Sequence, residues 1–162
     1  TLPALTLMEF NEVEGEGCAI GPMPVDVTKA SADKTIALFA LPGAYTPTCS
    51  AKHVPGYVEQ VEALRNAGVD EIWCVSVNDA FVMKAWGDST GAAAAGITML
   101  GDVDAGFTKA IGMNFSVPAI GFFDRSKRYA LYAVDGVVKV LNQGQETNAC
   151  EISGGQAMVD AI

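Results

Sequence analysis

Cys49 is the residue with the clearest potential for chemistry, because it directly follows a short loop, PGAYTPT (42–48), that is rich in Pro and Gly. The run 35–41 is apolar and of strand length, and the pattern from about 49 to 66 predicts a helix, so the thiol falls in a first helical turn. Unpaired N–H groups and the helix dipole favour an anion there and lower the pKa of a thiol. The sequence therefore indicates a reactive thiolate; a buried cysteine that only fills a core gap is the alternative.

Three familiar uses of a cysteine fit the neighbouring residues poorly. A cysteine protease needs a histidine base from elsewhere in the fold, whereas the chain's one histidine, His53, lies four residues further along the same predicted helix. A zinc site built on Cys49 and His53 lacks the usual paired ligands, and a Cys-x-x-Cys oxidoreductase would carry cysteine where Lys52 stands. What remains is a single thiolate that attacks an oxidant and becomes a sulfenic acid.

Composition narrows the class of protein further. The 162 residues are 50% hydrophobic and 18% charged, which excludes a disordered chain and predicts one globular domain over 1–162. The net charge of −9 disfavours nucleic acid as a partner, and no apolar run approaches the roughly eighteen residues that cross a membrane. The four cysteines form no Cys-x-x-Cys pair, which favours a reducing compartment. We expect no metal and no cofactor.

Strand and helix patterns alternate along the chain and predict an α/β sandwich with a central mixed sheet and helices on both faces. The predicted strands are LTLMEF (5–10), 35–41, 71–77, 97–100, 129–134 and 137–141, the last two flanking the turn pair Asp135-Gly136. The predicted helices are 49–66, with a kink at Pro55, and 79–86, 104–112 and 155–162. The stretch between the first strand and Pro24 is predicted to be a loop. Ligands collect beyond the carboxyl ends of such strands, which is where Cys49 would lie.

The segment LPGAYTPTCSAKHVPGYVEQ (41–60) carries a family resemblance. Its spacing Pro-x-x-x-Thr-x-x-Cys, met by Pro42, Thr46 and Cys49, resembles the active-site signature of the type II or type 5 peroxiredoxins. Two further blocks, VDEIWCVSVNDAFVMKAW and RSKRYALYAVDGVVKVLN, continue the match. The resemblance implies a thioredoxin-like three-layer sandwich and a thiol-dependent peroxidase that reduces hydrogen peroxide and alkyl hydroperoxides.

The resemblance also implies roles for four residues. Cys49 would be the peroxidatic cysteine, and the Thr46 hydroxyl would hold the thiolate and a peroxide oxygen together. Arg128 would supply a fixed positive charge to the thiolate and to the leaving oxygen; its alternative is a surface cation beside Lys127. Pro42 would shield the sulfur from water.

Other residues of the matching blocks have less definite roles. Arg125 is a candidate for orienting the site, and His53 has no assigned chemistry beyond that of an exposed helix residue. In relatives, the block with Phe81 and Trp86 borders a homodimer contact, whereas ordinary core packing is the alternative. The apolar stretch 113–124 departs from the family pattern, and it either reshapes substrate access or makes an additional contact.

Reduction of the sulfenic acid leaves three possibilities open. Cys74 stands where plant-type relatives have a resolving cysteine, but it lies within an apolar strand and is equally consistent with an inert core thiol. Cys150 lies near, although not at, the position of the animal-type resolving cysteine, and Cys18 has no indicated function. Direct reduction by glutathione or glutaredoxin needs neither cysteine and is favoured over a thioredoxin donor.

A different class of function on the same fold is a redox-sensing or thiol–disulfide exchange module. Pro42, Thr46 and Arg128 argue against a sensor, since a sensor does not need fast attack on peroxide. The expected location is the cytoplasm, or an organelle if a transit peptide has been removed.

Overall fold

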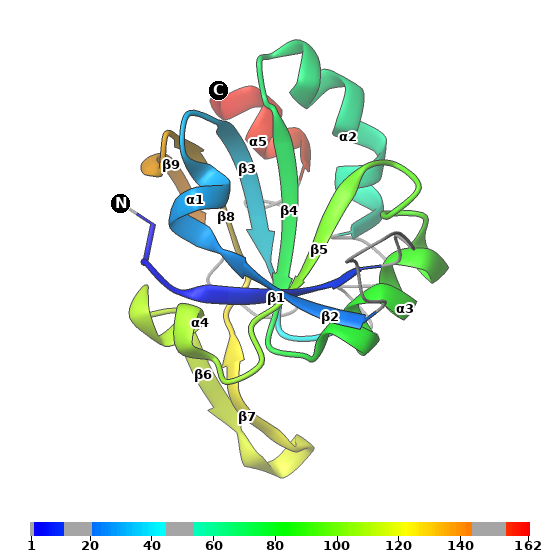
Figure 1. Cartoon of the computed structure of the whole chain (residues 1–162), viewed down its shortest axis with the longest axis vertical. Helices are drawn as coiled ribbons and strands as arrows, with labels where there is room; N and C mark the ends of the chain where they lie inside the picture. Colours follow the sequence, from blue (N-terminus) through cyan, green and yellow to red (C-terminus); the bar gives the residue numbers. More distant parts are fainter. Residues whose placement is uncertain (1, 12–20, 45–53, 144–154) are drawn as a thin grey trace.

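The computed structural model describes residues 2–11, 21–44, 54–143 and 155–162. It contains a seven-stranded sheet of order β2-β1-β5-β4-β3-β8-β9 and a separate hairpin of β6 and β7 (Figure 1). The strands are β1 (Thr6–Asn11), β2 (Gly21–Asp26), β3 (Thr35–Ala40), β4 (Glu71–Ser76), β5 (Ile97–Gly101), β6 (Asn114–Val117), β7 (Phe122–Ser126), β8 (Tyr129–Val134) and β9 (Val137–Gln143). The helices are α1 (Val27–Ser31), α2 (Val54–Asn66), α3 (Ala80–Thr90), α4 (Gly106–Ala110), the 3-10 turn η2 (Pro118–Ile120) and α5 (Gly155–Ala161).

The sheet is mixed, as the sequence predicts. β3, β4 and β5 run parallel to one another, while β8 pairs antiparallel with β3 and β1 pairs antiparallel with β5. In β3 and β4 every residue after the first is buried, which is the reason why these segments read as continuous apolar runs.

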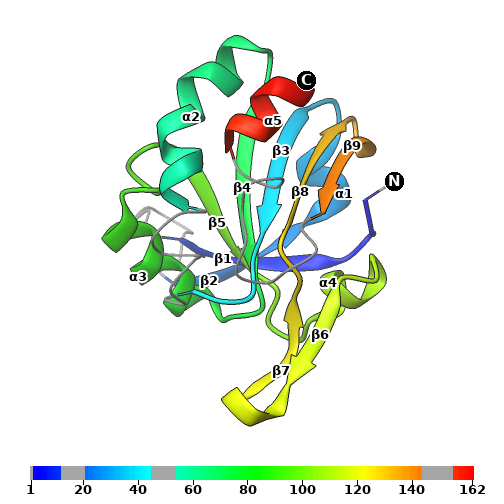
Figure 2. The same cartoon turned by 180° about the vertical axis from the view of Figure 1, so that it is seen from behind.

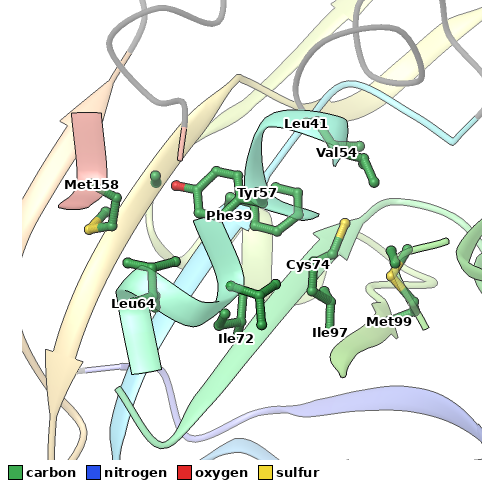
Figure 3. Close-up of a cluster of buried hydrophobic side chains, with 14 of the residues drawn as sticks. Phe39, Leu41, Val54, Tyr57, Leu64, Ile72, Cys74, Ile97, Met99 and Met158 are labelled. Carbon is green, nitrogen blue, oxygen red and sulfur yellow. The ribbon is translucent and has the colours of Figure 1, made fainter. Parts of the chain in front are cut away.

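Two apolar layers cover the two faces of the sheet. One contains side chains of α2, α3 and α5, and part of it is drawn in Figure 3; the other contains side chains of α1 and α4. The views from the front and from behind show α2 and α5 on the face opposite α1 and α4 (Figures 1 and 2). The predicted α/β sandwich with helices on both faces is confirmed.

The Asp135-Gly136 turn between β8 and β9 is confirmed as a tight hairpin. Both residues have positive φ, 49° and 76°, which is the backbone that this residue pair favours. The Asp135 carboxylate also accepts a hydrogen bond from the Asp33 N–H at 2.7 Å, so the turn is tied to the end of α1.

Other element boundaries differ from the prediction. The loop predicted through Pro24 is wrong from residue 21 onward, because this stretch is β2, paired antiparallel with β1 at the edge of the sheet. An edge strand tolerates Pro22 and Pro24, since their missing donors break no central ladder. The helix predicted over 104–112 is confirmed only as the shorter α4.

The described part of α2 begins at Val54, with Pro55 as its second residue. The kink predicted there concerns 49–53 as well, which lie outside the described residues.

The apolar stretch 113–124 forms most of a hairpin that the sequence analysis did not predict. β6 and β7 project from the body of the molecule next to α4 (Figures 1 and 2). Ile120 and Phe123 are each 65% exposed on it, so the hairpin presents apolar surface to its surroundings. Exposed apolar surface of this kind is typical of an additional contact, which is one of the two roles considered for this stretch beside substrate access.

Candidate functional site

The site predicted from the sequence begins where β3 ends. Beyond Ala40 the chain continues through Leu41 and Pro42, which are buried, to the half-buried Ala44. Thr46, Cys49 and His53 lie outside the described residues, as do Cys18 and Cys150. The roles predicted for these residues therefore stay predictions. The described residues near the end of β3 show which side chains and charges such a site would contain.

The helix that follows the undescribed segment is anchored at the same end of the sheet. Val54, its first described residue, is fully buried, and the Tyr57 ring stacks on the Phe39 ring with centroids 3.9 Å apart and planes inclined by 9°. Figure 3 shows Leu41, from the chain just after β3, beside Val54. Both flanks of the segment that holds Thr46 and Cys49 thus pack into one apolar layer.

Arg128 is buried next to this end of β3. Only 2% of its surface is exposed, which makes the surface-cation alternative wrong. Its neighbour Tyr129 pairs with Ala40, the last residue of β3, and this register brings Arg128 to the level where the chain leaves the sheet. A guanidinium is permanently charged, and its burial is expensive unless it is matched by a counter-charge or by hydrogen bonds. The structure therefore places a fixed positive charge at the expected carboxyl edge.

Cys74 lies in the middle of β4 and is completely buried. It sits between Phe39 of β3 and Met99 of β5, and Figure 3 shows its sulfur directed toward Val54 at the start of α2. Burial raises the pKa of the Tyr57 hydroxyl, and the nearby Cys74 raises it further. The thiol thus faces the helix layer of the site, but in a dry environment typical of an inert core cysteine.

The remaining candidate residues differ in their burial and in their contacts. Trp86 is buried in the core, in agreement with ordinary core packing, the alternative considered for it. Phe81 is 60% exposed and contacts the Phe10 ring edge-to-face, with the two ring centroids 5.4 Å apart. Arg125 donates through Nη1 to the carbonyl oxygen of Val77 at 3.2 Å. Its guanidinium also lies over the Phe122 ring, 5.3 Å from the centroid.

Asn78 is a site residue that the sequence analysis missed. Its Oδ1 accepts from the Ala44 N–H at 3.0 Å, and so joins the connection after β4 to the chain after β3. The available signal was its position immediately beyond a buried parallel strand, at the edge where ligands collect.

Metal-binding groups and membrane-spanning helices are both absent from the described part of the chain. Among those residues no group of three or more His, Cys, Asp or Glu side chains could hold a metal ion. Within the same residues, no helix is long and apolar enough to span a bilayer.

Comparison with known proteins gives consistent results. The Redoxin family model matches residues 2–158. The rice protein Peroxiredoxin-2E-2, chloroplastic (Oryza sativa subsp. japonica) is 45% identical over 163 residues, which cover 99% of this chain and 70% of the relative. Peroxiredoxin-2C of the same plant is 42% identical, over 85% of this chain and 84% of the relative. The crystal structure of reduced Prx3 in complex with H2O2 from Vibrio vulnificus superposes with a TM-score of 0.89 at 42% identity, covering 99% of this chain and 95% of that one.

Proposed function

Because the chain belongs to the peroxiredoxins within the Redoxin family, and is therefore a thiol-dependent peroxidase, we propose that Cys49 is its peroxidatic residue, assisted by Thr46, Arg128 and Pro42. The observation that carries this assignment is the burial of the Arg128 charge beside the end of β3. Burying a positive charge costs desolvation free energy, and stabilisation of an anion at the same edge of the sheet is a function that would account for this cost.

In the proposed reaction the Cys49 thiolate attacks one oxygen of a peroxide. A sulfur–oxygen bond forms while the oxygen–oxygen bond breaks, and the leaving hydroxide or alkoxide takes up a proton to become water or an alcohol. Arg128 stabilises the negative charge as it moves from sulfur to the leaving oxygen. The Thr46 hydroxyl orients the peroxide, and Pro42, which is buried, keeps water away from the sulfur.

We further propose that the Cys49 sulfenic acid is reduced directly by glutathione or glutaredoxin. Cys74 is completely buried between two neighbouring strands, and a disulfide to Cys49 needs Cα atoms within about 7 Å and correctly directed Cβ atoms. An external thiol that attacks the Cys49 sulfenic acid reduces it without displacing β4. Thioredoxin as donor, with Cys74 or Cys150 as the resolving residue, is the competing cycle.

A homodimer is the assembly we propose, with Phe81 in the contact. Phe81 is 60% exposed beside Phe10, and Ile120 and Phe123 on the β6–β7 hairpin are 65% exposed. Large apolar side chains that are exposed in groups, rather than singly, are typical of contact surfaces. For location, we propose a reducing compartment, either the cytoplasm or an organelle such as the one named for the rice relative.

The test is peroxide turnover together with peptide mapping after one equivalent of hydrogen peroxide, on the unmodified chain and on Cys49→Ser, Cys74→Ser and Cys150→Ser. We expect turnover to vanish in Cys49→Ser and to persist in the other two variants with glutathione and glutaredoxin. A disulfide from Cys49 to Cys74 or Cys150 would contradict direct reduction and indicate a thioredoxin cycle. Oxidation of another thiol while Cys49 stays reduced would contradict the assignment of the peroxidatic residue. Oxidation of Cys49 without turnover would favour the redox-sensing module.

A further inference from the structure

We propose that Asn78 is a positioning residue for peroxide reduction, because its side chain fixes the loop 42–44 that leads directly into the segment with Thr46 and Cys49. The proposal rests on the peroxidase function assigned above. It gives Asn78 no contact with peroxide: Asn78 acts through the backbone of Ala44.

The side-chain oxygen of Asn78 has two donors of its own chain. It accepts from the Ala44 N–H at 3.0 Å and from the Ser76 hydroxyl at 2.6 Å. Ser76 is fully buried, so its hydroxyl depends on a partner inside the protein. An amide oxygen has two lone pairs, and these two bonds use both. The orientation of the Asn78 amide is thereby determined, with its oxygen directed toward the loop after β3.

The backbone under Asn78 is also fixed. The Ser76 carbonyl oxygen accepts from the Asn78 N–H at 2.9 Å and from the Asp102 N–H at 2.8 Å. Gly101 packs so closely that a Cβ there would lie 2.5 Å from the Asn78 carbonyl oxygen. Arg125 donates a hydrogen bond to the carbonyl oxygen of Val77, the residue before Asn78, at 3.2 Å. The connection between β4 and α3 is therefore a firm support rather than a pliable turn.

The loop 42–44 receives this support just before the chain leaves the described region. Figures 1 and 2 both show it running beside the β4–α3 connection. Pro42 has no N–H, so only Gly43 and Ala44 have backbone donors that can hold the loop. A nucleophile displaced by as little as about 1 Å can lose up to about 100-fold in rate, so a distant hydrogen bond that fixes its approach matters to catalysis.

The decisive variant is Asn78→Ala, studied in the full chain with hydrogen peroxide. We expect kcat/KM for peroxide to fall by about 10- to 100-fold. We also expect the pH midpoint of Cys49 alkylation to move upward, because a loop that is no longer held in place positions the Cys49 thiolate less well against the groups that stabilise its negative charge. Asn78→Asp keeps an acceptor oxygen for the Ala44 N–H, so its kcat/KM should fall less than that of Asn78→Ala at the same ionic strength, although salt screens the added charge on this half-buried residue only weakly.

Asp79→Ala is the matched control. Asp79 caps α3 by accepting from the Val82 N–H at 2.8 Å, so its loss weakens the same connection without touching the Ala44 bond. We expect kcat/KM and the alkylation midpoint of Asp79→Ala to match those of the unmodified chain. If Asn78→Ala does not fold, Asn78→Ser, which keeps a polar atom near the Ser76 hydroxyl, takes its place.

Two outcomes would overturn the proposal: Asn78→Ala within about twofold of the unmodified chain at every pH, or Asp79→Ala losing as much activity as Asn78→Ala. If the unmodified chain shows no Cys49-dependent turnover, the assignment of the peroxidatic residue fails instead, so the two failures are distinguishable.

Discussion

Replacement of Tyr129 by Phe should stabilise the protein. Tyr129 begins β8 and is completely buried in the layer that contains α1 and α4. Its hydroxyl has no hydrogen-bond partner among the described residues, and burial, with the nearby Asp102 carboxylate, raises the pKa of the phenol. The hydroxyl thus stays protonated, and unpaired among the described residues, in the native state, whereas it is hydrated in the unfolded chain.

The size of the effect follows from two opposing contributions. A buried polar group without a partner costs about 1–3 kcal/mol relative to water, and Tyr129→Phe removes that cost. Deleting one oxygen leaves a void smaller than a methyl group, which costs less than about 1 kcal/mol. We therefore expect the free energy of unfolding to rise by about 1 kcal/mol, which corresponds to about 2–4 °C in Tm for a chain of this length.

Urea denaturation at neutral pH measures this change, with the slope m expected to be unchanged. Tyr132→Phe is the control, because Tyr132 lies on the same strand but is only half-buried; its effect should be within about 0.5 kcal/mol. A decrease of about 1 kcal/mol or more in Tyr129→Phe alone would refute the reasoning, since it would mean that the hydroxyl has a partner such as a buried water.

Three further changes test other features of the fold. Asp102→Asn should lower the free energy of unfolding by about 2–3 kcal/mol in urea denaturation. The buried Asp102 carboxylate accepts hydrogen bonds from the Thr108 N–H at 2.8 Å and from the Thr108 hydroxyl at 2.6 Å, and an amide nitrogen in its place would face these donors with a donor of its own. An unchanged denaturation midpoint would contradict this. Gly101→Ala should cost about 1–3 kcal/mol by the same assay, because the new Cβ would meet the Asn78 carbonyl oxygen, which is backbone and cannot turn aside. Burial, and secondarily a neighbouring carboxylate, raises the pKa of Glu9 above 4.5, so the native state binds this proton more tightly than the unfolded chain and loses stability as pH rises through that window. Glu9→Gln should therefore be more stable than the unmodified chain at pH 7 and should lose this advantage toward pH 4, as thermal unfolding at both pH values would show.

The fold was predictable from the sequence where burial and turn chemistry agree. β3 and β4 are apolar throughout because both of their faces are covered, and Asp135-Gly136 adopts the positive φ angles that its residue types allow. β2 was missed because Pro22 and Pro24 normally indicate a loop, and only the position of the strand at the sheet edge makes them tolerable.

The site was predictable only in part. The spacing of Pro42, Thr46 and Cys49 resembles the signature of the family and thereby implies the chemistry, but neighbouring charged residues could not reveal that Arg128 is buried. Asn78 could not be found from spacing, because its partner Ala44 is 34 residues away and only the parallel pairing of β3 with β4 brings their ends together.

At one edge of this sheet, residues that stabilise the fold share hydrogen bonds with the residue proposed to support the reaction. At the carboxyl ends of the parallel strands, the Ser76 carbonyl accepts the N–H groups of both Asp102 and Asn78, and Asn78 in turn holds Ala44. A change that disturbs Asp102 therefore reaches the loop before Cys49 through three hydrogen bonds. Tyr129 lies near Asp102, in the layer that contains α4, but its hydroxyl forms no hydrogen bond with the described residues of this network. Substitutions at Asp102 should consequently lower peroxide turnover even under conditions where the protein remains folded, since the support of the loop is weakened before the core is lost.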